Sequence, residues 1–237
     1  MDDLAKALAY QVKREIAERY FGVRKAIEED RSVLDGQLED LAAFHEQKIG
    51  PDLLRIYSIL VSPELIKRFL DAVGWQGMPY YDDYVVHSRT IRDRLFTGME
   101  DRGWTAFHRF RNRLFESYEK LYGDAIVYHD MVEEARDQAA LVKEEIARFS
   151  REFSLDDIIA FVKDLERRED LESVLGGNLS GGAISGLEER LGLEPVQDIE
   201  ARIPPVPDLP LPDRIRGLLT ELAEAAFAVS RREGEGG

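Results

Sequence analysis

Hydrophobic positions recur at three- and four-residue steps along most of the chain, which is the period of an amphipathic helix. The first such stripe lies between Leu4 and Gln47, a stretch without proline. It predicts one long helix or a helix pair, with Asp35-Gly36 as the candidate break and Gly50-Pro51 as the end. The stripe consists of Val12, Ile16, Tyr20, Val23, Ile27, Leu34, Leu38 and Leu41.

The same pattern predicts further helices up to Leu175, bounded by capping residues and glycines. Ser62-Pro63 should open a helix that stops at Gly74, because serine caps and proline suits the first helical position. Other apolar stripes predict helices over 80–97, 103–122 and 124–149, with Gly123 separating the last two. Ser154 and Asp157 form a capping box that should open a helix reaching Leu175.

The composition changes after residue 175. Residues 176–186, GGNLSGGAISG, predict a flexible loop, and a short helix should follow over 185–192. Residues 195–212 are rich in proline and should not be helical. Pro212 suits the start of a last helix, whose apolar stripe is Ile215, Leu218, Leu222, Ala226 and Val229.

No stretch alternates like a strand, so the expected fold class is all-α. We expect a bundle of long amphipathic helices with an extended proline-rich C-terminal arm and a terminal helix. The predicted division is a bundle over 1–175, a loop, short helix and arm over 176–212, a docking helix over 213–232, and a disordered tail over 233–237.

The arm carries an apolar ridge, because Ile203, Val206 and Leu209 recur every third residue, the period of polyproline II. A solvated linker would not need such a ridge, so we expect it to lie in a groove of its own chain or of a second copy. The ridge, with Leu218 and Leu222 of the terminal helix, is the predicted interaction surface, and we favour its use at a dimer contact.

Charge and composition exclude several functions. The chain has 237 residues, a net charge of −15, a pI near 4.8 and no cysteine. Nucleic-acid binding is therefore not expected, and thiolate chemistry is excluded. The N-terminus lacks an apolar signal segment and no apolar run is long enough to cross a membrane, so we expect a cytoplasmic protein.

One basic stretch interrupts this acidic chain. His87–Phe115 has seven arginines against three acids, a local charge of +4, interleaved with aromatic residues. Arg111 is the residue that the helical wheel does not explain, because its neighbours three, four and seven positions away are mostly apolar. We expect either a buried carboxylate partner or a pocket for an anion. The candidate anion residues are Arg111, His108, Arg89, Arg92 and Trp104.

The histidines give a weaker metal signal. His129 and Glu133 lie one helical turn apart, and His45 continues an apolar stripe near a helix end. His129, Glu133 and His45 are therefore candidate metal ligands, although we expect structural histidines and no cofactor. No nucleophile–base constellation is legible, and the glycine loop lacks the lysine of a phosphate-binding loop.

The sequence thus favours a cytoplasmic, non-enzymatic interaction or scaffold protein that binds protein, either itself as a homodimer or another chain. The alternative is a helical bundle that holds a small anionic ligand or a metal near Arg111 and acts as a hydrolase. A carboxylate partner for Arg111 would favour the first, and an open polar cavity the second.

Overall fold

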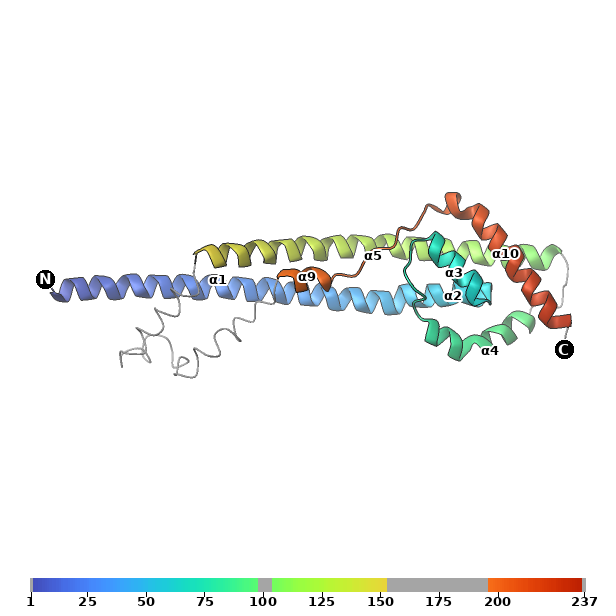
Figure 1. Ribbon diagram of the computed structural model, residues 1–237, viewed down its shortest axis with the longest axis horizontal. Helices are drawn as coiled ribbons and strands as arrows, with labels where there is room; N and C mark the ends of the chain where they lie inside the picture. Colours follow the sequence, from blue (N-terminus) through green and yellow to red (C-terminus); the bar gives the residue numbers. More distant parts are fainter. Residues whose placement is uncertain (1, 98–103, 153–195, 236–237) are drawn as a thin grey trace. The chain divides into compact units, whose positions relative to one another are not determined.

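The computed structural model describes residues 2–97, 104–152 and 196–235, and every regular element in these residues is helical (Figure 1). The all-α prediction is confirmed for this part of the chain. The helices are α1 (Asp2–Phe44), a π-helical turn η1 (His45–Ile49), α2 (Gly50–Leu60), α3 (Pro63–Ala72), α4 (Tyr81–Thr97), α5 (Trp104–Glu152), α9 (Val196–Ala201) and α10 (Pro212–Glu235). None of these described helices has a stretch long and apolar enough to cross a membrane.

Two predicted breaks are wrong, because α1 continues through Gly36 and α5 continues through Gly123. Both glycines have open space where a Cβ would stand. A single glycine costs a helix only about 1 kcal/mol relative to alanine, and helices of 43 and 49 residues accommodate that cost. The helix expected over 154–175, the loop 176–186 and the short helix over 185–192 lie outside the described residues.

The predicted end of the first helix at Gly50-Pro51 is also wrong. The helical backbone continues from α1 through η1 into α2, and Gly50 itself is right-handed helical, with φ −57° and ψ −53°. Proline has no N–H to donate to the preceding turn, which normally interrupts a helix. Here one helical turn holds one additional residue, as in a π-helix. The Gly50 N–H donates to the His45 carbonyl, which lies five positions back and not four. Pro51 then occupies the first turn of α2, where no N–H is needed.

Three other predicted boundaries agree with the structure, whereas α10 continues to Glu235, past the predicted end at residue 232, so residues 233–235 are helical and not part of a disordered tail. Ser62 precedes α3 in an extended conformation, and Gly74 follows that helix with a left-handed φ of 66°. The terminal helix begins at Pro212 as expected. One correction concerns 195–212: residues 196–201 lack proline and form α9, whereas 204–211 have no regular structure.

The chain divides into two compact units. The first unit comprises Met1–Leu38 and Glu134–Ile203. Its α5 segment buries one side of the helix, consisting of Ala135, Ala139, Val142, Ile146 and Phe149. Polar contacts tie α9 into the same unit, because Lys143 pairs with Glu200 at 2.7 Å and Arg202 pairs with Asp35 at 2.6 Å.

The second unit comprises Glu39–Glu133 and Pro204–Gly237. Within it α4 packs on α2, and α10 packs on both α2 and α3 (Figure 1). Its fully buried side chains include Leu53, Ile56, Phe69, Leu70, Leu114, Tyr118 and Leu222. Phe69 of α3 meets Tyr118 of α5 edge to face, with ring centroids 6.0 Å apart. All the candidate groups described below belong to this unit, except Ile203 of the arm, which belongs to the first unit.

Candidate functional site

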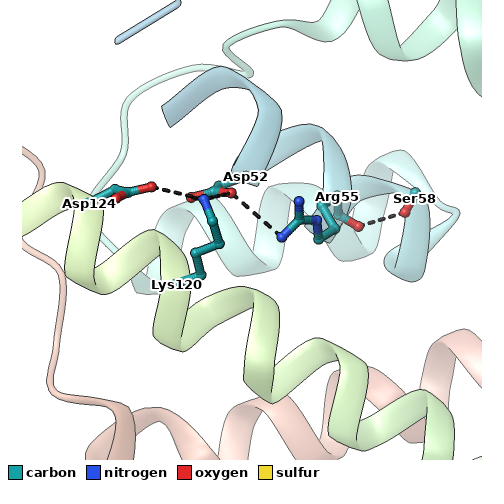
Figure 2. Close-up of polar contacts among 5 residues, drawn as sticks. All are labelled: Asp52, Arg55, Ser58, Lys120 and Asp124. Atoms are coloured by element: carbon teal, nitrogen blue, oxygen red, sulfur yellow. Dashed lines mark hydrogen bonds and ion pairs between the residues drawn. The ribbon is translucent and has the colours of Figure 1, made fainter. Parts of the chain in front are cut away.

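A buried carboxylate forms the centre of a small ionic cluster in the second unit. Asp52 of α2 is 1% exposed, and Lys120 of α5 reaches it from the facing helix (Figure 2). The Lys120 ammonium donates to both Asp52 oxygens, at 2.7 and 2.8 Å, and to Asp124 at 3.0 Å. Arg55 lies farther from Asp52, at 3.8 Å. Lys120 therefore supplies the hydrogen bonds that Asp52 receives from a cation.

The protonation of this cluster follows from its surroundings. Burial raises the pKa of Asp52, although the Lys120 ammonium opposes that shift. The hydrogen bond to Asp52 raises the pKa of Lys120, so the amine stays charged at neutral pH. Such a pair fixes which residues of two helices face each other more than it adds net stability.

Sequence reasoning missed Asp52, and a weak signal was present. The residue follows Pro51 in the first turn of a helix, where an acid is ordinarily read as favourable to the helix dipole. Leu53, Ile56 and Leu60 around it are fully buried, so the carboxylate lies on the border of the core face. Only the position of Lys120 on another helix shows that the acid is buried and paired.

A second group joins His45 to three aromatic rings. The Tyr80 hydroxyl oxygen lies 2.6 Å from Nδ1 of His45 and 3.0 Å from the backbone carbonyl oxygen of His45. The hydroxyl has one proton, so it can donate to only one of these two acceptors at a time. The imidazole also contacts Trp75, Tyr80 and Tyr128, with centroid distances of 5.8, 5.5 and 5.5 Å. His45 is therefore held from several sides.

The backbone is unusual on both sides of this contact. Tyr80 has a left-handed φ of 61°, which a non-glycine residue rarely adopts, and His45 begins the π-helical turn. A Cβ on Gly50 would lie 2.6 Å from the Tyr80 ring, so only glycine lets the ring approach this closely. Strained backbone of this kind persists only where the surrounding packing holds it.

The electrostatics of this group favour neutral rings. Burial lowers the pKa of His45. Burial is also the main reason why the pKa of Tyr80 rises to about 12, and the negative charge of nearby Glu46 adds to that rise. A neutral imidazole and a neutral phenol share one hydrogen bond at physiological pH.

The predicted metal ligands are not brought together as a metal centre. His45 binds Tyr80, whereas His129 is exposed and lies 3.8 Å from Asp130. Glu133 is exposed as well. Among the residues that the structure describes, no group of three histidine, cysteine or acidic side chains could hold a metal ion.

Arg111 lacks the expected carboxylate partner among the described residues. Its guanidinium carbon lies 5.6 Å from the centroid of Phe115, and so does that of Arg216 from α10. Its Nε atom is buried without a hydrogen-bond partner in this part of the chain. Arg216 was not singled out from the sequence, because only the fold brings α10 to this stretch of α5.

The other candidate anion residues are distributed differently. Trp104 is 75% exposed and stacks on Phe107, and His108 contacts both rings at 4.9 and 5.8 Å. Arg89 and Arg92 belong to α4, but their side chains lie outside the described part of the structure. The structure thus gives Arg111 an aromatic neighbour and a second arginine, and leaves the role of Arg89 and Arg92 a prediction.

The proline-rich arm contacts its own chain in the second unit. The Tyr118 hydroxyl donates to the Pro210 carbonyl, and the Asp208 backbone lies 3.3 Å from where a Cβ on Gly74 would stand. The ridge residues Ile203, Val206 and Leu209 are half-buried. In the terminal helix Leu218 is half-buried and Leu222 is fully buried. Use of the arm between two copies stays a prediction.

Comparisons with known proteins identify no relative: no family model, no curated protein and no solved structure matches this chain.

Proposed function

We propose that this chain is a cytoplasmic, non-enzymatic interaction protein that associates with a second copy of itself. In this proposal its long amphipathic helices pack as a bundle, and the proline-rich arm with α10 fastens the end of that bundle. One observation carries the proposal. Helix α4 exposes three large apolar side chains, Tyr81, Val85 and Val86, which we call the α4 apolar face.

The α4 apolar face is unusual for a solvent-facing surface. Val86 is 74% exposed and Val85 is 50% exposed. Tyr81 lies one turn before Val85, whereas Val86 points about 100° away from Val85, so the three side chains cover a broad arc of the helix. The buried side of α4 is provided by Tyr84, which meets Tyr57 of α2 edge to face at 6.2 Å. The helix is therefore already packed on one side, and its second apolar side is available for association.

A second copy is the partner that we favour. A twofold contact places the same helix face on both subunits, so one apolar patch is enough to form an interface. Burying a valine or tyrosine side chain completely contributes about 1.5–3 kcal/mol. Several such side chains on each copy, less the cost of association, support a weak to moderate dimer.

Sedimentation velocity over about 1–100 µM protein tests this proposal. The native chain should show a dimer that dissociates on dilution. Val86→Glu should weaken it by at least about tenfold, because an unpaired carboxylate would be buried in the contact. Leu141→Glu is the matched control, since Leu141 is also exposed but belongs to the first unit, and it should leave the dimer unchanged.

Two results would overturn the proposal. One is a native chain that stays monomeric at the highest concentration. The other is a dimer that Val86→Glu and Val85→Glu both leave intact, which would place the contact elsewhere and make the arm the next segment to examine.

A further inference from the structure

Two arginines converge on one aromatic ring in the second unit. Arg111 and Phe115 lie one turn apart on α5, and Arg216 comes from the second turn of α10. Each guanidinium carbon lies 5.6 Å from the Phe115 ring centroid. The distance between the two guanidinium carbons therefore cannot exceed twice that value. Two like charges therefore contact the same ring, and the ring faces of Phe115 attract both.

The negative charge that would balance this pair is largely missing from the described residues. Arg111 has no carboxylate within ion-pair distance there, and Arg216 has only Asp213 at 3.5 Å. Both members of that pair are mostly exposed, so water screens their attraction. This is unusual in a chain with 47 acidic and 32 basic residues. Lys120 of the same unit, in contrast, pairs with the buried carboxylate of Asp52.

The half-buried Arg111 is also oriented. Its Nε atom is buried, so the terminal nitrogens form the outer edge of the guanidinium. The stem is anchored on α5 and the planar head rests near Phe115, which limits the rotamers that the side chain can adopt. A guanidinium held in this way loses little further entropy when it binds an anion, and its fork of donors matches an oxyanion.

We propose that Arg111 and Arg216 form a binding site for a doubly charged oxyanion, of which a phosphate monoester is the simplest case. The terminal nitrogens of Arg111 would donate to one pair of oxygens and the more mobile head of Arg216 to another. Two guanidinium charges match the two negative charges of a phosphoryl group at neutral pH. This inference does not depend on self-association through α4, because it uses other residues and another ligand.

A titration with inorganic phosphate and with phenyl phosphate at constant ionic strength tests the site. The signals of arginine Nε–Hε pairs in a nitrogen–proton NMR spectrum report binding at each guanidinium. The native chain should show saturable shifts for Arg111 and Arg216. Arg216→Gln should lower the affinity by about tenfold or more without affecting folding, because Arg216 is 61% exposed.

Variants at Arg111 and a matched control complete the design. Arg111→Gln should abolish binding, and Arg111→Lys should recover only part of it, since lysine keeps the charge but not the fork. Arg109→Gln removes an exposed arginine of the same helix and should change the affinity by less than about twofold. Circular dichroism at 222 nm confirms that each variant is folded.

The outcomes separate the explanations. Binding of phosphate that depends on both Arg111 and Arg216 supports the site. Acetate binding as tightly as phosphate through the same residues would replace the phosphoryl group by a carboxylate, and would overturn the assignment of a dianion. No saturable binding by the folded native chain, or equal loss in Arg109→Gln, would show that the two arginines only pack on Phe115.

Discussion

Replacing Lys120 by methionine removes the cation that satisfies the buried Asp52. The carboxylate would keep its 1% exposure but lose contacts of 2.7 and 2.8 Å to both of its oxygens. Arg55, at 3.8 Å, is too distant to make a hydrogen bond. Methionine preserves most of the volume of the lysine stem, so the loss of charge dominates the effect.

The expected cost follows from the burial of the two partners. Breaking a fully buried ion pair costs about 3–5 kcal/mol, whereas an exposed pair contributes about 0–1 kcal/mol. Asp52 belongs to the first case, but the side chain of Lys120 is 46% exposed. We therefore expect Lys120→Met to lower the free energy of unfolding by about 2–4 kcal/mol at pH 7. That is a large part of the stability of an ordinary domain.

Urea denaturation followed by circular dichroism measures this change, and Arg68→Met is the control. Arg68 pairs with Glu221 at 3.3 Å in the same unit, but both side chains are exposed, so its loss should cost less than about 1 kcal/mol. Asp52→Leu in the Lys120→Met background should recover much of the stability, since no charge then remains buried.

The pH dependence provides a second check. Burial raises the pKa of Asp52 in the folded chain, so the folded state takes up this proton more readily than the unfolded state. Stability from this group therefore falls as pH rises through that pKa. Without Lys120 the shift should grow, and the deficit of Lys120→Met should shrink between pH 7 and pH 4. A deficit no larger than that of Arg68→Met, or one independent of pH, would refute the reasoning.

Two further substitutions test other parts of the structure. Gly50→Ala should lower the free energy of unfolding by about 1–3 kcal/mol, because the new Cβ would lie 2.6 Å from the Tyr80 ring. Gly123→Ala adds a Cβ in open space within a helix, so it should raise the free energy of unfolding by about 0.5–1 kcal/mol. Equal effects of the two in thermal denaturation would contradict the close approach. Glu145→Gln should raise the unfolding temperature at pH 7, because burial and the neighbouring carboxylate of Asp30 raise the pKa of Glu145 and make its charged form unfavourable. The gain should vanish as pH falls below that raised pKa, and a gain that persists in acid would exclude this cause.

The sequence was sufficient to predict elements whose signals are local. The start of α3 at Ser62-Pro63, its end at Gly74 and the start of α10 at Pro212 all depend on backbone chemistry within a few residues. The glycines at 36 and 123 misled the prediction because a weak local preference is outweighed by packing along a long helix. The prolines on both sides of residues 196–201 predict an extended arm, but these six residues lack proline themselves and form the short helix α9.

The candidate sites were less predictable, since their members come from helices far apart in the chain. The pairing of Asp52 with Lys120 spans 68 residues, and Arg111 meets Arg216 at Phe115 only because α10 returns to α5. The helical wheel predicted apolar neighbours for Arg111, and in the structure its Nε atom is buried and its guanidinium lies near Phe115. It could not show whether the neighbour would be an acid or an aromatic ring, because a wheel describes one helix alone.

The π-helical turn also changes the phase of the apolar stripe. Ile27, Leu34 and Leu41 are buried at intervals of seven residues, and the next buried residue is Ile49, eight positions on. If the spacing of seven residues continued after Leu41, the next buried position would be Lys48 and not Ile49. The wide turn absorbs the additional residue, after which Ile49 and Ile56 resume the interval of seven. In this chain, the step of eight residues just before Gly50-Pro51 therefore accompanies a helix that continues through the proline.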